Sequence, residues 1–183
     1  MSRFIAFLRA INVGGHTVKM DALRQIFESF GFSNVETFIA SGNVIFETAE
    51  TDAATLELQI AAGLRQALGY EVATFIRTPG EVTAIAACQP FPQAQFEAAA
   101  AFNVAFLSSP LDEGPTRKLL ALRTEIDDFA ICGREVYWLC RVKQSESTFS
   151  NAVFEKTLGL TATWRGINTL ERLAAKYPPP SAR

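Results

Sequence analysis

Apolar residues follow two patterns along the chain, short continuous runs and longer stripes of helical period. The run 4–8 is apolar on both faces, which is typical of an interior strand covered on two sides. A helical stripe from Met20 to Phe30 comes next, and Gly31 ends it. The same reading predicts strands at 35–40, 43–47 and 70–77, a helix between Asp52 and Gly69, and a helix from Pro79 through Ala86.

The order within residues 4–77 is strand, helix, strand, strand, helix, strand, which is the ferredoxin-like plan. The second half repeats this order at low identity, with strands at 102–108, 126–132, 135–140 and 160–165, a helix from Pro115 through Leu122, and a helix from Phe149 through Leu158. A further helix follows each unit, beginning near Thr78 and near Asn168. We therefore predict an α+β fold of duplicated ferredoxin-like units, each with an extra C-terminal helix.

The repeat also predicts the domain boundaries. They are 1–87 for the first unit, 88–100 for a connector, 101–177 for the second unit and 178–183 for a tail. Because the runs 4–8 and 136–139 are apolar on both faces, we expect the open face of each sheet to be covered. An RNA-recognition module needs that face exposed.

Composition and charge mainly argue against certain classes of protein and partner. Hydrophobic residues make up 49% and charged residues 20% of the 183, which fits a globular protein with a sizeable core. The formal net charge of −2 and the pI near 5.5 argue against nucleic acid or an anionic membrane as a partner. Without a signal segment or an apolar run of membrane length, we expect a cytoplasmic monomer or weak homodimer. The three cysteines lack metal-ligand spacing, and we expect no metal site.

Two polar stretches, 9–15 and 41–43, interrupt the apolar runs. Glycines between a strand and a helix let backbone approach a ligand and leave amide N–H groups for an anion. Arg9 is suited to bind a carboxylate or phosphate through its fork of donors. Because the first and third strands are antiparallel neighbours, we expect both stretches at one rim. The candidate ligand-binding residues are Arg9, Asn12, Gly14, Gly15, Lys19, Ser41, Gly42, Asn43 and Arg165.

Each candidate also has a structural interpretation. The glycine pair lacks the dinucleotide fingerprint and the P-loop lysine, so a tight turn accounts for it equally well. Arg9 is equally suited to a structural ion pair, and Asn12 to an Asx-turn in its own loop. Ser41 and Asn43 are ordinary hairpin residues. His16 is the one histidine, and its spacing supports no catalytic triad, so no catalytic residue is assigned.

The run 8–15, Gly31-Phe32, and Ser41-Gly42-Asn43 resemble a bacterial family of uncharacterised proteins, domain of unknown function 1697. Thr163, Arg165, Asn168 and Thr169 match its late motif, whereas Ala10 replaces a usual glycine and Gly166-Ile167 a usual Asn-Trp. The resemblance implies a duplicated ferredoxin-like fold. It implies no reaction, substrate or cofactor, and the cofactor stays unknown.

The leading hypothesis is a protein that binds a small anionic or nucleotide-like ligand at the carboxyl end of the first strand. An alternative is an enzyme of phosphoryl or acyl transfer in the same cleft, with Arg165 as a second electrostatic clamp. A third hypothesis, single-stranded RNA binding, rests on fold analogy alone.

Overall fold

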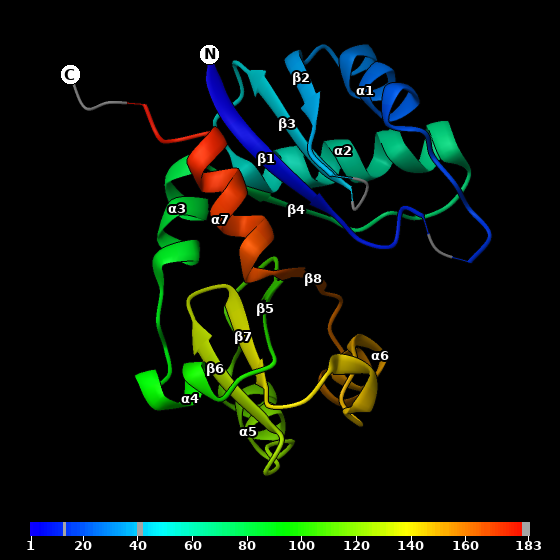
Figure 1. The fold of residues 1–183 in the computed structure, drawn as a ribbon. Coiled ribbons are helices and arrows are strands. Elements are labelled where there is room, and N and C mark those ends of the chain that lie inside the picture. The colour runs from blue at the N-terminus through cyan, green and yellow to red at the C-terminus, as the bar shows by residue number, and fades with distance from the viewer. Residues whose placement is uncertain (13, 40–41, 181–183) are drawn as a thin grey trace. The chain divides into compact units, whose positions relative to one another are not determined.

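The computed structural model describes residues 1–12, 14–39 and 42–180, and Figure 1 shows its elements. The first half forms a four-stranded antiparallel sheet with strand order β2-β3-β1-β4. Its elements are β1 (Ser2–Leu8), α1 (Met20–Ser29), β2 (Ser33–Thr37), β3 (Asn43–Thr48), α2 (Ala53–Leu68) and β4 (Thr74–Arg77). This is the ferredoxin-like order that the apolar pattern predicts.

The second half repeats this topology in a sheet of order β6-β7-β5-β8. Its elements are β5 (Ala101–Phe106), α5 (Glu113–Leu120), β6 (Asp127–Cys132), β7 (Glu135–Cys140), a 3-10 turn (Gln144–Glu146), α6 (Asn151–Leu158) and β8 (Thr163–Gly166). Helices α3 (Pro79–Ala87) and α7 (Ile167–Lys176) follow β4 and β8. The predicted α+β fold of two duplicated ferredoxin-like units with extra helices is confirmed.

Local sequence sets the ends of these helices. Asp52 accepts a hydrogen bond from the backbone N–H of Thr55 at the start of α2, and Gly69 ends that helix with a φ of 81°. At the start of α3, Thr78 and Glu81 form the predicted capping box. The Glu81 carboxylate accepts from the Thr78 N–H at 2.7 Å, and the Thr78 hydroxyl accepts from the Glu81 N–H at 3.2 Å.

Each unit has its own apolar core between its helices and one face of its sheet. In the first unit, Phe27 of α1 and Ile60 of α2 are fully buried against Phe46 of β3. In the second unit, Leu119 of α5 and Phe154 of α6 have the same role. The opposite sheet faces are buried too. Residues 4–8 of β1 and all of β7 are buried, as their apolar pattern predicts.

Several local predictions differ from the structure. The strand expected at 160–165, for example, begins only at Thr163. The strand expected at 70–77 begins only at Thr74, because its partner β1 ends at Leu8, which pairs with Thr74. The strand expected at 35–40 ends at Thr37, so the connection to β3 is longer than the tight turn predicted at Ser41-Gly42. The connector 88–100 contains a short helix, α4 (Gln93–Glu97), which follows Pro92.

The chain divides into two compact units, Met1–Ala84 with Leu173–Arg183, and Ile85–Arg172. It therefore passes from one unit to the other within α3 and again within α7. The predicted boundaries follow the repeat instead and keep each of these helices whole. Within the described residues, no helix has both the length and the apolar character needed to cross a membrane.

Candidate functional site

The candidate residues of the first unit lie at the end of its sheet where β1 finishes and β3 begins. Phe7 pairs with Asn43, and the Leu8 N–H donates to the Gly42 carbonyl at 2.8 Å. The two polar stretches are therefore neighbours, as the antiparallel order predicts. Ser41 lies outside the described residues. We call the others the first-unit rim, which consists of Arg9, Asn12, Gly14, Gly15, Lys19, Gly42 and Asn43.

The backbone of the rim is repeatedly left-handed. Gly14 and Gly15 have φ values of 70° and 84°, and a Cβ on either would meet no atom within 4 Å. Gly42, with a φ of 75°, is tightly packed, because a Cβ there would lie 3.0 Å from Ile11 Cγ2. Ala10 also has a positive φ, 54°, where a side chain is strained. A glycine at position 10 would adopt this backbone conformation without that strain.

The two asparagines of the rim hold its backbone. Asn12 Oδ1 accepts from the Val18 N–H at 2.8 Å and so closes the loop after β1. Asn43 is fully buried, and its Nδ2 donates to the Phe38 carbonyl at 2.9 Å. These contacts favour the structural interpretation of both side chains.

Two cations flank the glycine loop in the sequence. Arg9 is half-buried and Lys19, which precedes α1, is exposed, while residues 9–19 contain no aspartate or glutamate. His16 stacks on Tyr70 with 3.9 Å between ring centroids, and the Tyr70 hydroxyl donates to the Ile11 carbonyl at 3.0 Å. The contacts of Tyr70 with Ile11 and His16 therefore hold the loop in place. Its cations and backbone amides are groups suited to an anion.

Arg165 belongs to the second unit and has an equivalent in the first. Val104 of β5 pairs with Arg165 as Ile5 of β1 pairs with Arg77. Arg165 is 7% exposed, and its Nη1 donates to the Thr163 hydroxyl and to the Trp164 carbonyl, both at 2.8 Å. Burial lowers the pKa of Arg165 to about 10, so it stays charged at neutral pH. A part for Arg165 in ligand binding stays a prediction.

The edge strands β4 and β8 are held in a similar way, by an arginine of the strand and a glutamate of the helix beside it. Arg77 donates to the Ile76 carbonyl at 2.8 Å, and Glu57 of α2 accepts from the Ile76 N–H at 2.8 Å. In the second unit, Glu155 of α6 accepts from the Ala162 N–H at 3.1 Å. The two units therefore share the glutamate-to-backbone hydrogen bond that joins α2 to β4 and α6 to the start of β8.

One candidate was missed from the sequence. Asn103 interrupts the apolar strand β5, is 9% exposed, and has a buried Nδ2 without a hydrogen-bond partner. Other atoms of this residue border a pocket of about 550 Å³. A single polar residue inside an apolar run was the available signal. As for metals, the described residues hold no cluster of three or more His, Cys, Asp or Glu suited to an ion.

Two sheets of equivalent topology, each followed by a helix, define a protein of duplicated ferredoxin-like architecture. The chain belongs to the family described as "Protein of unknown function (DUF1697)", whose model matches residues 1–137. This confirms the resemblance carried by the glycine loop and the Ser-Gly-Asn hairpin.

A solved structure has the same fold. It is that of the conserved bacterial protein SP0830 from Streptococcus pneumoniae, which is 20% identical, with a TM-score of 0.73 over 98% of this chain and 99% of that one. No curated protein matches the sequence.

Proposed function

We propose that the protein binds a small anionic ligand, such as a phosphate-bearing metabolite or a nucleotide, at the first-unit rim. The observation that carries the proposal is the exposed left-handed pair Gly14 and Gly15, flanked in sequence by Arg9 and Lys19 in a segment without acidic residues. Successive backbone N–H groups in such a turn form a concave site for an anion.

Each group has a distinct part in this proposal. Arg9 supplies a planar fork suited to a phosphate or carboxylate, and Lys19 supplies a mobile point charge. Asn12, through its bond to the Val18 N–H, fixes the loop that carries the glycines. Since the cations are near the surface, we expect affinity to fall as salt is added.

Thermal-shift and calorimetric titrations with inorganic phosphate, pyrophosphate, ATP and acetate test the proposal. A ligand at one hundred times its dissociation constant adds about 2.7 kcal/mol of stability. We expect Arg9→Ala and Lys19→Ala each to weaken binding about tenfold or more while the protein stays folded. Arg24→Ala is the matched control, because Arg24 is an exposed arginine of α1 that pairs with Asp21 at 3.4 Å.

Two results would contradict the proposal. One is the absence of stabilisation by any of the four anions. The other is unfolding of Arg9→Ala without any ligand for the wild type, which would make Arg9 a structural residue.

The alternatives rank lower on specific grounds. Single-stranded RNA modules stack bases on an exposed sheet face, whereas β1 and β7 are buried on both faces. Phosphoryl or acyl transfer at the rim would use a general base, and the one histidine, His16, is stacked on Tyr70.

A further inference from the structure

Two of the three cysteines lie together in the second unit, although they are far apart in the sequence. Cys88 is the first residue after α3, and Cys132 is the last residue of β6. Their thiol groups are within hydrogen-bonding contact of each other. Both residues belong to the compact unit Ile85–Arg172, so the contact lies within one unit. The anion proposal uses neither of them.

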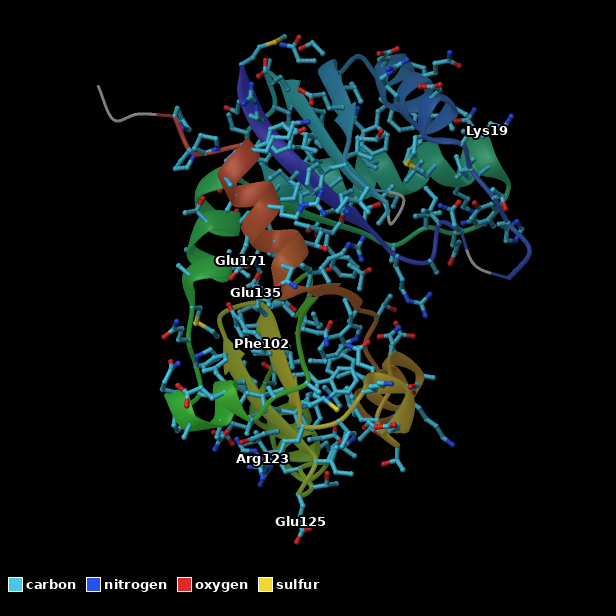
Figure 2. All side chains as sticks on the ribbon, viewed as in Figure 1. Lys19, Phe102, Arg123, Glu125, Glu135 and Glu171 are labelled. Carbon is cyan, nitrogen blue, oxygen red and sulfur yellow. The ribbon has the colours of Figure 1, made fainter. Side chains whose placement is uncertain are left out.

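Tyr137 of β7 holds this pair in place. Its side chain is 1% exposed, and its hydroxyl donates to the Ile85 carbonyl at 3.1 Å, which joins β7 to the end of α3. The same hydroxyl is in hydrogen-bonding contact with the Cys88 thiol. Because Cys132 pairs with Glu135 across the hairpin, its side chain is on the same face of the sheet as that of Tyr137. Figure 2 labels Glu135 at the start of β7.

Both of these thiols can be reached from solution, whereas the third cannot. Cys132 is exposed, and Cys88 is partly exposed and borders the pocket of about 550 Å³. Cys140 is fully buried in the core on the opposite face of β7. The chain therefore combines an accessible pair of thiols with a buried cysteine that serves as an internal control.

The backbone at both positions allows the two sulfurs to come closer together. A disulfide needs about 2.05 Å between its sulfur atoms, which is shorter than any non-bonded contact. Cys132 ends its strand at a turn where Gly133 has a φ of 61°, and Cys88 lies just beyond its helix. A small movement of either residue therefore leaves the interior of the sheet and of the helix intact.

The surroundings of Cys132 keep its side chain protonated. Partial burial, with the Cys88 thiol and Glu135 close by, raises the pKa of Cys132, so it is a neutral thiol at pH 7. Attack on a peroxide requires a thiolate. We therefore assign the first step of an oxidation to Cys88 and the second step to Cys132.

We propose that Cys88 and Cys132 form a reversible disulfide when the protein meets a peroxide. With hydrogen peroxide, the Cys88 thiolate attacks one oxygen, the O–O bond breaks, and one water leaves, so that Cys88 becomes a sulfenic acid. The Cys132 sulfur then attacks the Cys88 sulfur, the S–O bond breaks, and a second water leaves with the Cys132 proton. The two thiols lose two electrons in total, which reduce the peroxide to water. A dithiol restores both thiols by thiol–disulfide exchange.

Peptide mass spectrometry of the full chain, treated with hydrogen peroxide and alkylated without reduction, tests the bond. We expect one peptide pair joined through Cys88 and Cys132, which dithiothreitol separates, while Cys140 stays free. Cys132→Ser should form no such pair and should leave Cys88 as a sulfenic acid that dimedone traps. Cys140→Ala is the matched control, and it should form the disulfide as the wild type does.

Thermal unfolding followed by tryptophan fluorescence gives a second test, because Trp138 and Trp164 both belong to the second unit. Peroxide should raise the Tm of the wild type by about 5 °C or more, since the closed loop 88–132 constrains the unfolded chain. It should leave the Tm of Cys132→Ser unchanged. Both methionines, Met1 and Met20, belong to the first unit, so their oxidation should not alter this signal.

Three outcomes would overturn the proposal. The first is that peroxide produces no link between Cys88 and Cys132 within one chain. The second is an equal rise in Tm for the wild type and Cys132→Ser, which would place the effect of peroxide elsewhere. The third is a bond that forms but lowers the Tm, which would show that the fold does not accommodate it. Failure of phosphate to bind the wild type would refute only the anion site and leave this inference intact.

Discussion

Replacing Asn43 with aspartate tests whether the Asn43 amide has a structural role or contacts a ligand. The side chain is fully buried and its Nδ2 lies 2.9 Å from the Phe38 carbonyl oxygen. Asn43→Asp keeps the shape but places a carboxylate against that oxygen, unless the new group takes up a proton and donates it. Keeping an aspartic acid neutral at pH 7 costs about 4 kcal/mol, because its ordinary pKa is near 3.9 and each unit corresponds to about 1.36 kcal/mol.

We therefore expect Asn43→Asp to lower the free energy of unfolding by about 4 kcal/mol at pH 7 and by less than about 1 kcal/mol near pH 4. The direction of this pH dependence follows from the linkage between protonation and folding. Burial raises the pKa of the introduced acid in the folded state, so its destabilisation is present above the unfolded pKa and disappears below it. Asn43→Ala should cost about 1–3 kcal/mol at both pH values, since it leaves the Phe38 carbonyl unpaired without adding a charge.

Urea unfolding followed by far-UV circular dichroism measures both variants. Both tryptophans, Trp138 and Trp164, belong to the second unit, so fluorescence does not follow the first. A cost for Asn43→Asp below about 1 kcal/mol at pH 7, unchanged by acid, would show that the amide does not hold Phe38. The interpretation of Asn43 as a ligand-contacting residue would then be favoured over the structural one.

Three further predictions concern stability. Ala10→Gly should stabilise the protein by about 1 kcal/mol in urea unfolding, because Ala10 has a φ of 54°, and destabilisation would refute the strain. Tyr177→Phe should cost less than about 1 kcal/mol at pH 7, since the Tyr177 hydroxyl donates to the partly exposed Glu36 at 2.7 Å. The Tyr177 bond and Lys176 lower the pKa of Glu36 in the folded protein. The loss should therefore shrink as the pH falls from 4.5 through this lowered pKa, and a loss that persists in strong acid would contradict the prediction. Asp127→Ala should cost about 3 kcal/mol in thermal unfolding, because the buried carboxylate accepts from Trp138 Nε1 at 2.7 Å, and an unchanged Tm would show that the indole finds another acceptor.

The fold could be predicted because its determinants are local or periodic. The apolar runs, the left-handed glycine at 69 and the capping box at 78–81 each act over a few residues. The start of β4 at Thr74 depends instead on where its partner β1 ends, which residues 70–77 do not encode.

The sequence predicted the location of the candidate site better than it predicted the roles of the residues there. Antiparallel order was enough to bring Gly42 beside Leu8. The role of Asn43 was not predictable, because the sequence does not show whether the side chain of a hairpin asparagine faces solvent or bonds to the Phe38 carbonyl. Asn103 escaped notice because its amide loses its hydrogen-bond partners only once β5 is buried within the folded sheet.

The side-chain bonds to the backbone of β4 and β8 have a consequence for assembly. A further strand adds to a sheet through the outward N–H and C=O groups of the edge strand. On β4 the outward N–H and C=O of Ile76 are already bonded to Glu57 and Arg77, and on β8 the Trp164 carbonyl is bonded to Arg165. Strand addition at these two edges would have to break those bonds, so growth by edge-to-edge pairing is directed to β2 and β6, the opposite ends of the two sheets.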